Sequence, residues 1–164
     1  MSKKKIVTNA LRLLGAAKIN YETVEYECDE VGENFGEEIA EKTGIPPEQS
    51  FKTLVMRGDK TGIITVCIPV CNEADLKKIA KVSGNKKVEM IHVKELLALT
   101  GYIRGGVSPI GMKKKYPTYI DATAKGFEKA AVSAGICGCT VLLSPDDLQK
   151  ITECHFEDII KTEG

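Results

Sequence analysis

Short apolar runs alternate with polar, glycine-containing segments along the chain, and their spacing predicts helices and strands. Residues 6–17 place their apolar side chains on one stripe of a helix. The segment from Asn72 to Gly84 has a capping side chain at its start and a glycine at its end, which is typical of a second helix. The apolar runs 51–57 and 63–69 are joined by GDKTG, which predicts a β-hairpin. The other expected elements are an extended segment at 21–26, helices at 37–42, 92–100 and after Ser144, and strands at 86–91, 118–121, 128–133 and 140–144.

These elements predict an α/β fold. Strands and short helices interleave without the regular alternation of a doubly wound parallel sheet. We therefore expect one domain over residues 1–164, with a mixed, largely antiparallel central sheet that closes toward a barrel and helices packed outside it. The chain has 164 residues, which is enough to bury a hydrophobic core without stabilising disulfides or metals. It has no tryptophan, so this core must be mainly aliphatic.

Charge and cysteine usage narrow the classes of function. Acidic and basic residues balance at 23 each, so charge alone does not indicate a nucleic-acid protein. A polyanion would have to bind at a local basic patch. Lys113–Lys115 either form such a patch or are simply exposed to solvent. No apolar run approaches the ~20 residues of a membrane helix, and no signal sequence is evident, so we expect a cytoplasmic protein with six reduced cysteines. Their spacing does not suggest a metal site, although Cys137 and Cys139 leave a redox role open.

The stretch GYIRGGVSPIGMKKKYP, residues 101–117, is the most distinctive part of the sequence. Glycine lets the backbone approach a ligand closely and turn N–H groups toward it. Pro109 stiffens the far side and favours an extended Ser108. Two interpretations remain open from composition: a structural turn, or the wall of a binding site formed by Gly105, Gly106, Val107, Ser108 and Pro109.

Four further residues are candidates for the same site. Lys52 lies in an apolar strand and shares a face with Leu54, so its ammonium group either reaches water or stands at the mouth of a cavity. Ser133 and Gly135 end a predicted strand, where they form a turn or face a ligand, and Tyr26 is a packed aromatic or a ligand contact. The sequence lacks the motifs of a serine-hydrolase elbow, a phosphate-binding P-loop and a zinc protease.

Six stretches of the chain, taken in order, resemble the YbaK/prolyl-tRNA editing family, and the similarity is closest to its Cys-tRNA(Pro) deacylase branch. The resemblance covers nearly the whole chain. Its most specific part is the glycine-rich stretch. The stretches are TNALRLL, FKTLV, GYIRGGVSPIGMKK, TYID, VSAG and LSPDDL.

The resemblance implies a fold, a chemistry and a site. It implies an α/β fold around a barrel-like sheet, and an enzyme that discharges mischarged tRNA without a cofactor or metal. The family's catalytic lysine corresponds to Lys52, its GxxxP loop to residues 105–109, its strand-end serine to Ser133 and its pocket tyrosine to Tyr26. This chain departs from the family at Ile136 and Cys137, and it has Thr140 where many members have aspartate.

The leading hypothesis is therefore a deacylase that clears mischarged tRNA(Pro), with Cys-tRNA(Pro) the expected substrate. The cysteinyl thiol would attack its own carbonyl, which needs no catalytic triad. Prolyl-tRNA synthetase is the partner that the resemblance implies. A non-catalytic module that binds aminoacyl-nucleotide ends or a synthetase remains an alternative, and so does a thiol redox protein.

Overall fold

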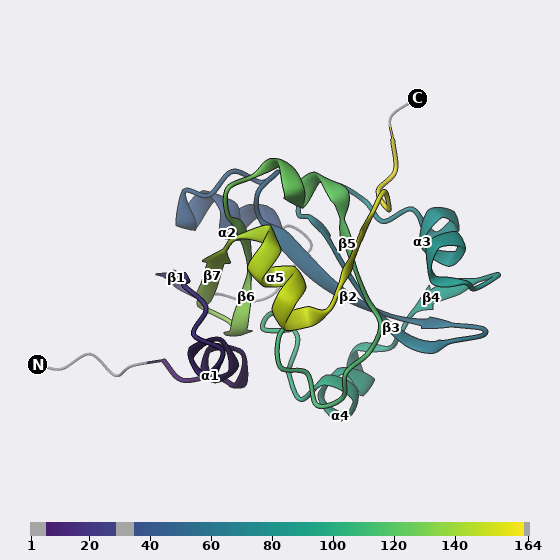
Figure 1. Cartoon of the computed structure of the whole chain (residues 1–164), viewed down its shortest axis with the longest axis horizontal. Helices are drawn as coiled ribbons and strands as arrows, with labels where there is room; N and C mark the ends of the chain where they lie inside the picture. Colours follow the sequence, from purple (N-terminus) through teal and green to yellow (C-terminus); the bar gives the residue numbers. More distant parts are fainter. Residues whose placement is uncertain (1–5, 29–34, 163–164) are drawn as a thin grey trace, which may run out of the picture.

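The computed structural model describes residues 6–28 and 35–162, which form two β-sheets flanked by helices (Figure 1). The strands are β1 (Glu22–Glu25), β2 (Phe51–Gly58), β3 (Gly62–Pro69), β4 (Val88–Met90), β5 (Thr118–Asp121), β6 (Ala130–Ile136), β7 (Cys139–Leu143) and β8 (His155–Glu157). The α-helices are α1 (Asn9–Ala16), α2 (Phe35–Thr43), α3 (Leu76–Ser83), α4 (Leu96–Thr100) and α5 (Pro145–Thr152), and η1 (Val93–Glu95) and η2 (Ala122–Gly126) are 3-10 turns. None of the described helices has the length and apolar character needed to cross a membrane.

The described strands form two open sheets. One has the order β1-β7-β6 and is antiparallel, and the other has the order β4-β2-β3-β5-β8. In the larger sheet β5 pairs in parallel with both β3 and β8, whereas β2 pairs antiparallel with β3 and β4. The prediction of a mixed, largely antiparallel α/β fold is confirmed. The barrel-like closure is not confirmed, because in the described part of the chain the β-pairing between the two sheets is limited to a single bridge between Ser50 and Ala131.

Local sequence explains the hairpin of β2 and β3, which carries Lys52. β2 and β3 pair from Phe51 opposite Pro69 to Gly58 opposite Gly62. Gly62 has a φ of +76°, a conformation that glycine adopts without steric cost. The side-chain oxygen of Asn85 accepts hydrogen bonds from the Lys60 and Thr61 amides, at 2.9 and 3.0 Å, and holds the turn.

The helix after this hairpin begins later than predicted. Asn72 was expected as its cap, but the cap is Asp75, whose side chain accepts hydrogen bonds from the amides of Lys77 and Lys78. An aspartate is equally suited to this position, and Asn72 instead ends the turn after β3, where its amide donates a hydrogen bond to the Pro69 carbonyl. The helix ends as predicted on Gly84, which has a left-handed conformation.

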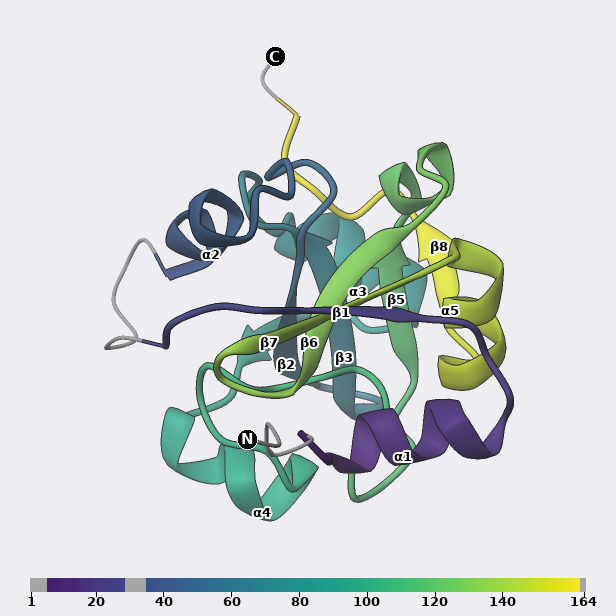
Figure 2. The ribbon, with the colours of Figure 1, turned by 90° about the vertical axis from the view of Figure 1, so that its left-hand side faces the viewer.

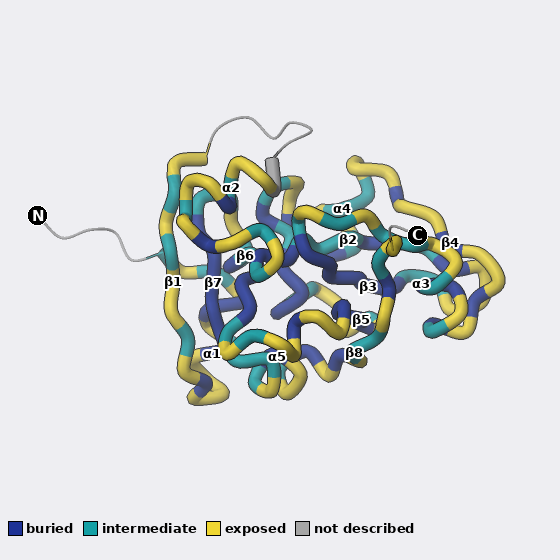
Figure 3. The backbone as a smooth tube through the Cα atoms, turned by 90° about the horizontal axis from the view of Figure 1, so that it is seen from above, coloured by how far each residue is buried: buried dark blue, intermediate teal, exposed yellow. Residues whose placement is uncertain are grey.

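Two main clusters of buried aliphatic side chains hold the two sheets (Figure 3). One packs α1 and α5 against β6 and β7 around Leu14, Val141 and Leu148. The other packs α3 against the larger sheet around Met56 and Ile79. Both clusters leave the first half of β2 half-buried at Lys52, Thr53 and Leu54, where the two sheets face each other across a groove.

The expectation that all six cysteines are reduced is wrong for two of them. Cys28 and Cys137 form a disulfide with their Cα atoms 5.7 Å apart, across a sequence separation of 109 residues. Spacing along the chain could not predict this pair, because pairing of β1 with β7 brings the two residues together. Cys67, Cys139 and Cys154 are free and buried, and Cys71 is free and exposed.

Candidate active site in a groove between the two sheets

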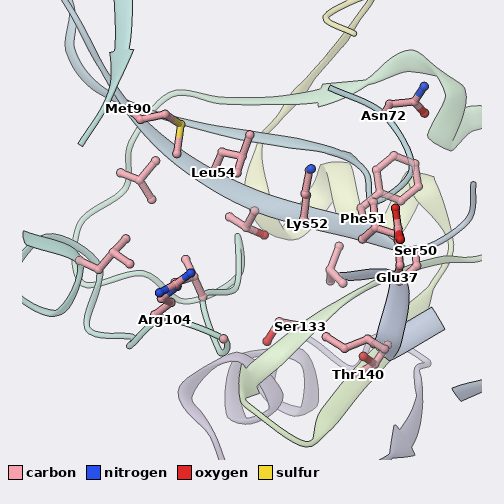
Figure 4. A pocket seen from close by; sticks show the side chains of 18 of the residues that line it. Glu37, Ser50, Phe51, Lys52, Leu54, Asn72, Met90, Arg104, Ser133 and Thr140 are labelled. Atoms are coloured by element: carbon pink, nitrogen blue, oxygen red, sulfur yellow. The ribbon is translucent and has the colours of Figure 1, made fainter. Parts of the chain in front are cut away.

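A groove of about 620 Å³ lies between β2 and the β6–β7 hairpin, and we call it the central groove (Figure 4). Its floor is the first half of β2. One wall is the glycine loop, residues 105–109, and the other elements around it are the β6 and β7 strands, α2 and the segment that follows β4. Figure 2 shows α2 and α4 on opposite sides of this part of the molecule. The groove extends between them, because its lining includes Glu37 and Ile39 of α2 and Leu96 of α4.

Lys52 lies in the middle of the groove. It pairs with Ile68 in the hairpin, its side chain is half-buried, and Figure 4 shows its amine projecting into the open space. Within residues 6–28 and 35–162 its amine has no hydrogen-bond or ion-pair partner. A single cation that no carboxylate neutralises can attract a carbonyl oxygen or an anionic group of a ligand.

The glycine loop is held rigidly from behind. The Tyr102 hydroxyl donates a hydrogen bond of 2.6 Å to the buried carbonyl of Ile110. The Ser108 hydroxyl accepts a bond from the Ile110 amide. A Cβ atom on Gly106 would lie 2.9 Å from the Cα of Ile136, so the loop packs directly on the turn of the β6–β7 hairpin.

Two amides of this loop are available to a ligand. The Gly106 amide donates to the carbonyl of Ile103 at 2.9 Å. The amides of Gly105 and Val107 have no acceptor in the part of the chain that the structure describes, and both residues line the groove. Free amides on a rigid loop are suited to bind an oxyanion or a carbonyl oxygen.

The smaller sheet forms the side of the groove that faces β2. Val132, Ser133 and Thr140 line the groove from β6 and β7, and Ser133 accepts a hydrogen bond of 3.2 Å from the Gly135 amide. Tyr26 closes this side, where its amide donates to the carbonyl of Gly138 at 2.9 Å. Burial raises the pKa of the Tyr26 phenol, so it stays a neutral hydrogen-bonding group at neutral pH.

The structure brings five of the nine predicted site residues to the groove. These are Tyr26, Lys52, Gly105, Val107 and Ser133. The other four lie behind the lining: Gly106, Ser108 and Pro109 are buried in the glycine loop, and Gly135 lies near the end of β6, where the register with β7 shifts.

The sequence interpretation missed several residues that line the groove. Arg104 directly precedes the glycine pair, and its position beside the loop was a usable signal. Glu37, Asn72, Met90 and Val93 line the two ends of the groove and belong to no recognisable motif. Thr140, noted only as a departure, also lies in the lining. Within the described residues no group of three acidic, histidine or cysteine side chains is placed to hold a metal ion.

The fold and the site together define a class: an α/β domain that presents one unpaired lysine and free backbone amides in a groove between two sheets. Comparison with known proteins is more specific. The family model for the aminoacyl-tRNA editing domain matches residues 33–151. An Enterococcus faecalis (strain ATCC 700802 / V583) protein named "Putative Cys-tRNA(Pro)/Cys-tRNA(Cys) deacylase EbsC" is 46% identical over 165 residues, which cover 99% of this chain and all of that protein. The chain therefore belongs to the aminoacyl-tRNA editing domain family.

Solved structures share the fold. A structure described as a "putative trans-editing enzyme for prolyl tRNA synthetase" superimposes with a TM-score of 0.80 at 24% identity, over 96% of this chain and 100% of that chain. The hypothetical protein APE2540 gives a TM-score of 0.83 at 19% identity, over 94% and 100% of the two chains. At these identities the likeness concerns the fold alone.

Proposed function

We propose that the chain is a trans-acting aminoacyl-tRNA deacylase that removes cysteine from mischarged tRNA(Pro). Membership of the editing family and the name of the 46% identical relative support the deacylase activity and the choice of substrate. The observation that carries the proposal is the meeting of Lys52 with the amides of Gly105 and Val107 in one groove. We also propose that it acts in the cytoplasm and as a single domain over residues 1–164.

The reaction needs no nucleophile from the protein. The sulfur of the cysteinyl side chain attacks the ester carbonyl carbon, and a C–S bond forms as negative charge develops on the carbonyl oxygen. The C–O bond to the ribose then breaks, the thiol proton goes to the ribose oxygen, and cysteine leaves as a thiolactone. Intramolecular attack of this kind is worth as much as ~7–11 kcal/mol when the geometry is held.

The protein's residues hold that geometry and stabilise the charge. The amides of Gly105 and Val107 would donate to the developing oxyanion, and one such donor is typically worth ~3–4 kcal/mol. Lys52 would orient the aminoacyl end from the opposite side. Ser133 and Thr140 would face the acyl group from the smaller sheet and limit its size.

A separate deacylase is needed because a synthetase cannot fully exclude an amino acid of similar size. A hydrophobic pocket separates side chains that differ by about one methylene by only ~1–3 kcal/mol, and cysteine is close to proline in size. We propose prolyl-tRNA synthetase as the partner that supplies tRNA selectivity, because a chain with 23 acidic and 23 basic residues offers little general attraction to tRNA.

The experiment is a deacylation assay on tRNA(Pro) charged with cysteine, serine, alanine or proline. The wild-type protein should discharge Cys-tRNA(Pro) fastest. Ser-tRNA(Pro), which has the same shape without the thiol, should be a poor substrate if the substrate's sulfur is the nucleophile. Detection of the thiolactone, before its hydrolysis to cysteine, would distinguish this route from direct attack by water.

Lys52→Ala tests the role of the lysine. Misplacement of a substrate by about 1 Å costs on the order of 100-fold, so we expect a loss of about that size in kcat/KM. Lys60→Ala, in the exposed hairpin turn, is the matched control. If the wild-type protein binds Cys-tRNA(Pro) but discharges none of the four substrates, the protein is a non-catalytic module and the proposal fails.

A further inference from the structure

The two ends of the central groove have opposite chemical character, which Lys52 and the glycine loop do not explain. At one end, beside η1 and α4, the lining is apolar and includes Met90, Val93 and the cation Arg104. At the other end, beside α2, it carries the acidic and amide side chains of Glu37, Glu73 and Asn72, next to the ring of Phe51. Figure 4 shows Met90 and Arg104 on one side of Lys52 and Glu37 on the other.

The apolar end resembles a platform for a flat ring. The side chains of Met90 and Val93 are 51% and 58% exposed although both line the groove, and Leu96 extends the same surface. Arg104 lines the same end of the groove, and it is exposed and without an acidic partner among the described residues. Apolar surface beside an unpaired guanidinium suits a nucleoside whose base packs on the side chains and whose phosphate pairs with the cation.

The polar end suits a small cation. Glu37 lies in the first turn of α2, exposed, and has no ion-pair partner in the described part of the chain, whereas Glu73 at the same end pairs with Lys161 at 3.2 Å. Burial is the main cause that raises the pKa of the Cys71 thiol; Glu37 also raises it and Lys52 lowers it. Cys71 also lines the groove, so Glu37 and Lys52 both lie near enough to act on this thiol.

We propose that the groove binds aminoacyl-tRNA in one orientation, with the terminal nucleoside on Met90, Val93 and Leu96 and the amino group of the amino acid toward Glu37. Arg104 pairs with the phosphate of that nucleoside. The ester bond then lies between the two ends, beside Lys52 and the amides of the glycine loop. This orientation rests on the proposed deacylase function and adds to it which residues recognise each half of the substrate.

Binding of the trinucleotide CCA, measured by NMR titration, tests the apolar end without any need for turnover. Val93→Ser and Arg104→Gln should each weaken CCA binding about fivefold or more, since apolar contact with one base and one charged contact to a phosphate contribute on this scale. Leu76→Ser is the control, because Leu76 is an exposed apolar residue on α3 outside the groove. Glu37→Gln should leave CCA binding unchanged.

Kinetics on Cys-tRNA(Pro) with a free or an N-acetylated α-amine test the polar end. The wild-type protein should prefer the free amine, and Glu37→Gln should lose that preference, whereas Glu38→Gln, one residue further on α2 and outside the lining, should keep it. Val93→Ser and Arg104→Gln should raise KM and leave kcat nearly unchanged.

The outcomes separate the two proposals. A wild-type protein that discharges no aminoacyl-tRNA overturns the proposed function. An active wild-type protein whose Val93→Ser and Arg104→Gln variants bind CCA as well as Leu76→Ser does overturns the orientation alone. Stronger CCA binding by Glu37→Gln, together with an unchanged amine preference, would show that the substrate lies the opposite way round.

Discussion

Replacement of Gly106 by alanine tests whether the position of the glycine loop controls activity. The φ angle of Gly106 lies outside the left-handed region, so alanine can adopt its backbone conformation. Space is the obstacle, because the new Cβ would lie 2.9 Å from the Cα of Ile136 and 3.0 Å from the amide nitrogen of Cys137. Both neighbours are backbone atoms, so the loop and the hairpin turn must separate by about 0.5 Å to restore ordinary contact.

This separation has two measurable consequences. Overpacking of this kind typically costs ~1–3 kcal/mol in the free energy of unfolding, which denaturant titration would detect. The loop also moves relative to Lys52. Because a misplacement of about 1 Å costs on the order of 100-fold, a shift of half that size should lower kcat/KM for Cys-tRNA(Pro) about tenfold.

The control is Gly126→Ala in η2, where a Cβ would meet nothing within 4 Å and the φ angle is likewise not left-handed. Single-turnover deacylation by the two variants and the wild-type protein supplies the comparison. If Gly106→Ala and Gly126→Ala have the same rate and the same stability, the close contact between the loop and the hairpin turn is not what positions the catalytic groups.

Three further predictions concern stability. Reduction of the Cys28–Cys137 disulfide should lower the free energy of unfolding by up to about 5 kcal/mol, given the long loop that it closes, whereas the Cys71→Ser variant should keep this response to reductant. Tyr102→Phe removes the hydrogen bond to the buried Ile110 carbonyl and should cost ~1–3 kcal/mol, measured by denaturant titration; an unchanged midpoint would contradict this. Burial raises the pKa of the Cys67 thiol to about 12 from 9.0. Above pH 9 the unfolded chain releases this proton and the folded chain keeps it, so stability should fall with rising pH, by about 1.4 kcal/mol per unit more than in Cys67→Ala.

Local sequence was sufficient to predict most of the elements. The hairpin over residues 51–69 follows from two apolar runs and a turn with glycine at each end, and the antiparallel pairing of β2 with β3 confirms it. The last helix follows from Ser144, whose hydroxyl accepts a hydrogen bond from the Asp147 amide as a cap should. Such signals depend on neighbours within a few residues, which the sequence displays directly.

Contacts between distant segments could not be predicted in the same way. β8 is only three residues long and pairs in parallel with β5, so its pattern is too short to indicate a strand. The closure of the sheet into a barrel was expected from strand content, but pairing partners decide it. The disulfide between Cys28 and Cys137 likewise depends on the pairing of β1 with β7.

In the candidate site, too, the residues with an unusual local sequence could be predicted, and those brought in by distant contacts could not. Lys52 and the glycine loop were found because an ammonium in an apolar strand and a glycine pair before proline are unusual in local sequence. Glu37 and Met90 look like ordinary surface residues in the sequence. They become part of the groove only because the fold brings α2 and β4 to its opposite ends.

The most direct test of the central claim is a crystal structure of the protein with cysteinyl-adenosine in which an amide replaces the ester. We expect the carbonyl oxygen to lie about 3 Å from the amide nitrogen of Gly105 or Val107, with the Lys52 amine facing the aminoacyl group. A carbonyl that binds outside the central groove, with both amides still without an acceptor, would contradict it.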